Sequence, residues 1–265
     1  MRAISIGYHD VVENGDAAKE LFRRCPLRYT LDRSSFRDHL NSIRETAPQA
    51  HIDKIDRFRI WKTQIPIFLT FDDGASGSYT CIAEDLERWN WRGHFFIITN
   101  YIGRPGFVDR RQIRELRERG HVIGSHTCSH PAQMSQLRWD ELRAEWSHSC
   151  AVLSEILGEQ VRAASVANGY YSRTVGRAAA ASGIEVLFNS EPTTAISAVD
   201  GCLVMGRYSI KADTSPAVSG AVAAGWTWPR WRQTALWETK KAGKALAGEH
   251  YLTVRNFLTS RGASK

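Results

Sequence analysis

The sequence contains no apolar run of the roughly 18 residues that a transmembrane helix needs. Its first residues reach Asp10 and Glu13 before the apolar region of a signal peptide could form, so we expect no secretory leader. The five cysteines are odd in number and form no Cys-x-x-Cys pair. These absences argue against a membrane span and a disulfide scaffold, and they predict a protein of the reducing cytosol.

Net positive charge is almost absent from the body of the chain and concentrated near its end. The 265-residue chain has a formal net charge of +7. From Trp226 to Lys265, eight Lys and Arg stand against two Glu, a net charge of +6, which leaves +1 for residues 1–225. We therefore expect one nearly neutral domain at 1–225 and a basic, Trp-rich helical tail at 226–265.

Apolar runs alternate with helical patterns along the body of the chain. Strands are expected at 3–8, 65–71, 94–99, 122–125, 161–166 and 184–188, with a late strand within 202–210. Helices are expected within 32–47 and at 79–91, 109–119, 140–157 and 172–182. Strands and helices that alternate at this spacing predict βα units and a mostly parallel sheet.

Polar residues follow several of these strands at the point where each ends. His9 follows the first, Asp72 and Asp73 the second, the segment from His126 to His130 another, and Asn168 a further one. Because ligands of such folds bind at the carboxyl ends of the strands, we expect these residues to converge on one site.

Residue types and spacing favour a metal site there. His126 and His130 are four apart, so a helix beginning at this loop would put both imidazoles on one face. Two His and one carboxylate are a frequent catalytic zinc set, and either Asp72 or Asp73 could be the oxygen ligand, with the other as general base. The alternatives are a chance pair of surface histidines, and an Asp-Asp-Gly segment that serves only as a turn.

The segments "TFDDG" (70–74) and "HTCSH" (126–130) resemble the first two motifs of the polysaccharide deacetylase family, the NodB-like carbohydrate esterase family 4. The resemblance implies a distorted, incomplete (β/α) barrel and removal of an N-acetyl, or O-acetyl, group from a sugar. It also implies that Asp72 is the base and that Asp73, His126 and His130 hold a divalent metal. Zinc is the first expectation, with cobalt and nickel as alternatives.

The third motif of the family, an Arg followed by prolines, is missing. The corresponding segment "ASVANGYYS" (164–172) has neither residue type. We expect Asn168, Gly169 and Tyr170 to form a turn whose backbone N–H groups face an oxyanion, although an ordinary strand-to-helix turn would look the same. Arg207, on the late strand, is the candidate replacement that orients the base.

The late Leu-x-His motif, which supplies the general acid in the family, is also missing. His9 in "GYHDVV" is the candidate, because a subgroup similar to the poly-N-acetylglucosamine deacetylases has a Tyr-His-Asp sequence near the N-terminus. The alternative is a buried structural histidine. Asp10 could orient His9 or only begin the loop.

The tail combines tryptophans with Lys and Arg, and an amphipathic helix is expected at about 231–246. Such a helix could lie on an anionic membrane surface, or it could pack its tryptophans on the barrel. The first alternative would put the protein at the inner membrane face with a lipid-linked glycan as substrate. Nothing else in the chain favours nucleic acid as a partner.

Together these observations predict a cytoplasmic, metal-dependent carbohydrate N-deacetylase of exopolysaccharide or lipopolysaccharide biosynthesis. Two alternatives are an impaired family member that binds carbohydrate without turnover, and a hydrolase of another non-peptide amide. The missing motif Arg is the reason for the first alternative.

Overall fold

The structure is a computed structural model of the whole chain, and it describes residues 1–13, 27–48, 52, 54–55, 65–228 and 233–235. Of the helix expected at about 231–246, only residues 233–235 are described, and these are helical. Most of the tail lies outside the described residues, so the division at 225 stays a prediction. Within the described ranges, no helix combines the length and apolar character that a membrane span requires.

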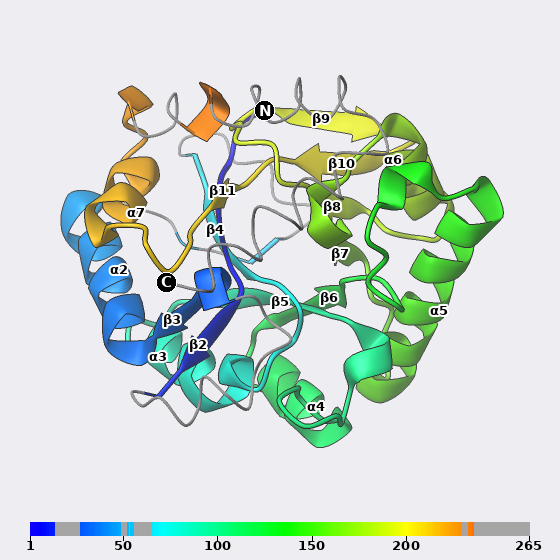
Figure 1. Cartoon of the computed structure of the whole chain (residues 1–265), viewed down its shortest axis with the longest axis horizontal. Coiled ribbons are helices and arrows are strands. Elements are labelled where there is room, and N and C mark those ends of the chain that lie inside the picture. The colour runs from blue at the N-terminus through cyan, green and yellow to red at the C-terminus, as the bar shows by residue number, and fades with distance from the viewer. Residues whose placement is uncertain (14–26, 49–51, 53, 56–64, 229–232, 236–265) are drawn as a thin grey trace, which may run out of the picture.

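A nine-stranded sheet forms the centre of the fold, and helices lie around it (Figure 1). The strand order is β11–β1–β4–β5–β6–β7–β8–β10–β9, and all neighbours are parallel except β10 and β9. The strands are β1 (Ile4–Tyr8), β4 (Ile67–Phe71), β5 (Gly93–Ile97), β6 (Val122–Ser125), β7 (Ala163–Ser165), β8 (Val186–Phe188), β9 (Ile196–Val199), β10 (Cys202–Met205) and β11 (Tyr208–Ser209). The predicted parallel βα array is therefore present.

The sheet is curled, so that its two ends come together. The chain passes from β10, near one end of the strand order, to β11 at the other end through Gly206 and Arg207 alone. An isolated bridge joins Arg2, just before β1, to Ala195, just before β9. The single late strand expected within 202–210 is wrong for this reason: the segment contributes two short strands that belong to opposite ends of the sheet.

Helices cover the outside of the curled sheet, and Figure 1 shows α2 and α7 side by side. They are α2 (Arg33–Thr46), α3 (Ala83–Glu87), α4 (Arg110–Glu118), α5 (Trp139–Leu157), α6 (Arg173–Ala181) and α7 (Pro216–Ala223). Short helical turns are η1 (Leu27–Tyr29), η2 (Ser78–Ile82), η3 (Thr99–Tyr101), η4 (Met134–Gln136) and η5 (Ala167–Gly169). The helix expected at 79–91 is instead the π-helical turn η2 followed by α3, which ends at Glu87.

The alternation of side chains along β4 decides what the strand carries into the barrel. Leu69 and Phe71 pack in the larger apolar cluster, whereas Phe68 packs in a smaller cluster with Phe96 and Phe188. Because successive residues of a strand face opposite sides, Thr70 shares the face of Phe68. Asp72, two positions after Thr70, therefore lies on the same face of the sheet as Phe68, which is the inner face of the barrel.

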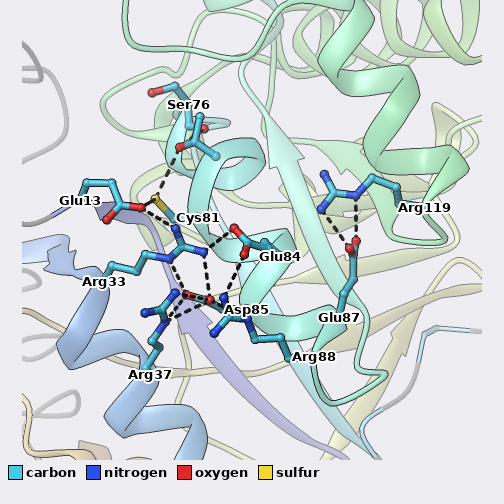
Figure 2. Close-up of polar contacts among 11 residues, drawn as sticks. Glu13, Arg33, Arg37, Ser76, Cys81, Glu84, Asp85, Glu87, Arg88 and Arg119 are labelled. Atoms are coloured by element: carbon cyan, nitrogen blue, oxygen red, sulfur yellow. Dashed lines mark hydrogen bonds and ion pairs between the residues drawn. The ribbon is translucent and has the colours of Figure 1, made fainter.

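A second, two-stranded parallel sheet pairs β2 (Asp10–Val12) with β3 (Thr30–Asp32). Arg33, directly after β3, donates to both oxygens of Asp85 in α3 at 2.8 and 3.0 Å, and Arg37 adds a bond of 3.0 Å (Figure 2). Arg33 also pairs with Glu13, directly after β2. This cluster ties the small sheet, which begins next to His9, to the helix that follows the Asp72–Asp73 loop.

Candidate functional site

Asp72 and Arg207 form a buried ion pair at the carboxyl end of β4. The Asp72 N–H donates to the Tyr8 carbonyl at 3.1 Å, so the β1–β4 ladder continues and the side chain stays on the inner face. The guanidinium donates to Asp72 Oδ1 at 2.7 Å and to Oδ2 at 2.9 Å, and its Nε donates to the Asn189 carbonyl at 3.0 Å. The Arg207 side chain is 4% exposed and that of Asp72 is 6% exposed.

The charge of Asp72 follows from this contact. Burial favours the protonated acid, but the guanidinium of Arg207, together with His126, outweighs burial and lowers the pKa of Asp72 below its ordinary value. Two parallel N–H···O bonds also fix the orientation of the carboxylate. Asp72 is thus a preorganised anion in the barrel mouth.

The other acid of the pair lies beside two imidazoles. Asp73 Oδ1 is 3.4 Å from His126 Nε2 and 3.7 Å from His130 Nε2. One ligand atom from each of these three residues can be chosen so that all lie within 4.8 Å of one another. Two imidazole nitrogens and one carboxylate oxygen suit a divalent transition metal.

The hydrogen bonds of His126 fit this donor set. Its Nδ1 lies 2.9 Å from the carbonyl of Ser165, which can only accept, so Nδ1 carries the proton and Nε2 can offer its lone pair. Burial lowers the pKa of His130 to about 4, so its imidazole is neutral near pH 7. Burial lowers the pKa of His126, but the carboxylates of Asp72 and Asp73 outweigh burial and raise it, so a metal would have to displace a proton from Nε2. The three side chains can hold a metal once that proton has left.

The backbone between the two histidines is irregular, and the expectation that a helix would pair them is wrong. Thr127 and His130 have φ of 68° and 58°, which no right-handed helix contains. The ring centroids nevertheless lie 5.1 Å apart. Asp73 and Asn168 also have positive φ, 74° and 56°, so four of the six such non-glycine residues in the described ranges lie in the loops of this site.

The turn at 168–170 lies next to the histidine loop. Asn168 donates from Nδ2 to the carbonyl of Pro131, the residue after His130, at 3.2 Å. Gly169 has φ of 67°, and a Cβ there would come within 2.6 Å of Ser190 Oγ, so the turn requires glycine. Tyr170 follows and is partly buried.

His9 lies directly after β1, among the charges of Asp73 and Asp72. Its ring stacks on that of Tyr29 in η1, with centroids 4.4 Å apart, and its Nδ1 is buried and has no hydrogen-bond partner among the described residues. Burial lowers the pKa of His9, although the two carboxylates oppose the effect. Asp10 turns instead to the backbone N–H of Val11 at 2.9 Å.

Two contacts of the site were not foreseen from the sequence. Tyr29 comes from the turn before β3, and the Ser165 carbonyl comes from β7. Tyr29 has no motif around it, and Ser165, although it lies within 164–172, contributes a backbone carbonyl that its residue type does not mark.

The comparisons with known proteins agree with this geometry. A profile described as polysaccharide deacetylase matches residues 62–187, which contain the two acids and the two histidines but neither His9 nor Arg207. YxkH of Bacillus subtilis is 25% identical over 155 residues, which are 58% of this chain and 53% of YxkH. The peptidoglycan-N-acetylglucosamine deacetylase PgdA of Listeria monocytogenes is 43% identical over 77 residues, 28% of this chain and 16% of PgdA.

A solved structure shares the architecture. The Streptococcus pyogenes deacetylase PplD, in complex with acetate, superposes with a TM-score of 0.68 at 19% identity and covers 82% of this chain and 95% of PplD. The expected incomplete (β/α) barrel is thereby confirmed as a curled, open sheet of this kind. The chain spans about half of YxkH and about a sixth of PgdA.

Proposed function

Since the chain belongs to the polysaccharide deacetylase family, we propose that it hydrolyses N-acetyl groups of a polysaccharide or lipid-linked glycan with the help of a divalent metal. The observation that carries this proposal is the pairing of a preorganised anion, Asp72 on Arg207, with a neighbouring Asp73–His126–His130 set. PgdA is named for the same chemistry on peptidoglycan. Which glycan this chain uses, and membership in the Tyr-His-Asp subgroup, stay predictions.

In this proposal Asp73, His126 and His130 would hold the ion. A divalent ion there would supply Lewis-acid chemistry, which lowers the pKa of water and polarises a carbonyl. Zinc is the first candidate, and cobalt and nickel are alternatives. The three side chains leave Asp72 outside the set, because Arg207 occupies both of its oxygens.

Asp72 would act as the general base. It accepts the proton of a water whose oxygen bonds to the acetyl carbonyl carbon, and Arg207 keeps the carboxylate ionised and oriented before that moment. The turn of Asn168, Gly169 and Tyr170 would face the oxyanion, but the Gly169 N–H already donates to the Val166 carbonyl at 3.3 Å, so another N–H of the turn would have to serve.

His9 would act as the general acid. Breaking of the C–N bond leaves an amine nitrogen that takes the proton from His9, and acetate departs. Because burial lowers the pKa of His9, the resting ring is neutral near pH 7 and would first take up the proton that it donates. Once protonated, the ring is a stronger acid than an exposed imidazolium.

The ion pair of Arg207 with Asp72 also bears on the alternative of an impaired carbohydrate-binding member. The missing motif Arg was the reason for that alternative, and a guanidinium from elsewhere now contacts the same carboxylate. This contact favours a working enzyme, with Arg207 as the orienting residue.

Metal analysis of the full chain, followed by acetate release from N-acetylglucosamine oligosaccharides, tests the proposal. For Asp72→Asn we expect turnover to fall by about 10²- to 10⁴-fold with metal still bound, since only the base is lost. His126→Ala should lose both metal and turnover. Asp200→Asn, at an exposed pair with Arg177, is the matched control and should keep both. Full turnover in Asp72→Asn would contradict the mechanism.

Membrane contact of the tail and a cytoplasmic location stay predictions. Trp226 and Trp228 are 59% and 65% exposed, and most of the remaining tail lies outside the described residues.

A further inference from the structure

The backbone between His126 and His130 needs an external support. Thr127 is β-branched and has a positive φ, a backbone conformation that is strained in such a residue and persists only when surrounding contacts hold it. Within the loop, the His130 N–H donates to Thr127 Oγ1 at 3.0 Å, and the Thr127 N–H donates to Ser125 Oγ at 3.1 Å. These bonds leave the N–H groups of Cys128 and Ser129 to be satisfied from outside the loop.

One side chain of α5 satisfies both. Glu145 Oε2 accepts from the Cys128 N–H at 2.8 Å and from the Ser129 N–H at 2.9 Å, and Oε1 accepts from Ser129 Oγ at 2.6 Å. Bonds from a carboxylate to consecutive N–H groups are charge-assisted and directional. One carboxylate thus binds the Cys128–Ser129 segment at three points, while on the η3 side the Asn100 N–H donates to the Cys128 carbonyl at 3.0 Å.

Helix α5 is itself a rigid support for this carboxylate. Trp146 and Ser149, which follow Glu145 by one and four positions along the helix, are both fully buried. Ser149 Oγ accepts from Ser125 Oγ at 2.7 Å, directly before His126, so α5 contacts the loop at its beginning as well as at its centre. A shift of the loop relative to α5 would have to break contacts at both places.

We infer that Glu145 is a positioning residue for the metal site: its carboxylate holds the Cys128–Ser129 backbone so that His126 and His130 present their Nε2 atoms to one ion. The inference rests on the proposed function, because it assigns Glu145 a part in that same site. Glu145 is not one of the three side chains that would hold the ion, so its role would be exerted through the backbone of the loop. Partners of this kind, behind a ligand, typically change metal affinity by 10- to 100-fold.

Titration of Zn²⁺ into the metal-free full-length chain, by calorimetry, tests the inference. For Glu145→Ala we expect the affinity for Zn²⁺ to fall by at least tenfold. Glu145→Gln keeps an oxygen acceptor for the two N–H groups and should bind within about threefold of the wild type. Glu155→Ala is the matched control, because Glu155 lies on the same helix and its ion pair, with Arg110, is at an exposed position.

The spectrum of the Co²⁺ form gives a second readout. Its visible bands report the ligand geometry, so Glu145→Ala should shift them, whereas a role in stability alone would lower the melting temperature and leave bands and affinity unchanged. If Glu145→Ala does not fold, Glu145→Asp is the second variant, because it keeps the negative charge but is one methylene too short to reach the loop. It should show the same tenfold loss of Zn²⁺ affinity. Wild-type affinity in the folded variant would overturn the inference, and a wild-type chain that binds none of Zn²⁺, Co²⁺ and Ni²⁺ would overturn the proposed metal site and this inference with it.

Discussion

Two adjacent acids have different surroundings in this chain, and Arg207 creates the difference. Both oxygens of Asp72 accept from its guanidinium, whereas Asp73 lies against two imidazoles. Residue type alone left either acid as a ligand. The contact comes from Arg207, 135 positions away between β10 and β11, the residue that the sequence analysis named as the candidate replacement for the missing motif Arg.

We predict that Arg207→Met lowers kcat by about 10²-fold or more, because Asp72 then loses the cation that keeps it ionised and oriented. The pKa of Asp72 should rise, so the acidic limb of the pH–activity profile should move to higher pH. Zn²⁺ affinity should stay near that of the wild type. Arg162→Met, at an exposed pair with Glu185, is the control. An unchanged acidic limb would contradict the role given to Arg207.

At the scale of elements, the cluster around Asp85 joins the two segments that carry His9 and the acid pair (Figure 2). The Asp85 side chain is 1% exposed. Burial opposes its charge, but Arg33 and Arg37 outweigh burial and lower the pKa of Asp85. Removing the charge would leave Arg33, 10% exposed, without its main partner.

We predict that Asp85→Asn costs about 3 kcal/mol of unfolding free energy, the range for breaking a buried ion pair from one side. Urea denaturation measures the change. Glu155→Gln, at the exposed pair with Arg110, should cost less than about 1 kcal/mol. If Asp85→Asn and Glu155→Gln lowered the unfolding free energy by the same amount, the expected difference between a buried and an exposed ion pair would be contradicted.

Several elements escaped sequence reasoning for identifiable reasons. Strands β2 and β3 have three residues each, too few for a period of two to show. Helix α7, with the sequence PAVSGAVA, consists of small and apolar residues on all sides, so no amphipathic stripe marks it. Both are stabilised by their neighbours, β3 by β2 and α7 by α2.

At the scale of the whole molecule, two fully buried histidines link folding to pH. The His121 Nδ1 accepts from the Gly93 N–H at 3.1 Å and its Nε2 lies 2.8 Å from Glu87 Oε1, so the neutral ring satisfies both partners. His39 Nδ1 lies 2.6 Å from Ser219 Oγ. Burial lowers the pKa of each to about 4 from an ordinary 6.5.

We predict that stability falls as the pH drops from about 6.5 to about 4. The unfolded chain takes up these protons near pH 6.5, whereas the folded chain takes them up only near pH 4. The contribution of the neutral histidines to the free energy of unfolding is therefore fully present above pH 6.5 and is lost as the pH falls to about 4. Each histidine contributes on the order of 3 kcal/mol. Urea unfolding at pH 7.5 and 5 measures the loss, and His121→Gln should reduce it, while the exposed control His148→Gln should not. A pH dependence identical in all three chains would contradict this.

The sequence by itself determined the parallel βα array and the convergence of Asp72, Asp73, His126 and His130, because apolar runs mark buried strands and parallel strands end on the same side of a sheet. Only the tertiary structure decided how they meet. β10 and β11 follow one another in the chain but lie near opposite ends of the strand order, and the curl of the sheet lets Arg207, between them, reach Asp72. The two histidines converge through a loop with positive φ at Thr127 and His130, which Glu145 holds from α5. Contacts between residues far apart in the chain depend on how all elements pack at once, and no local window of residues contains that information.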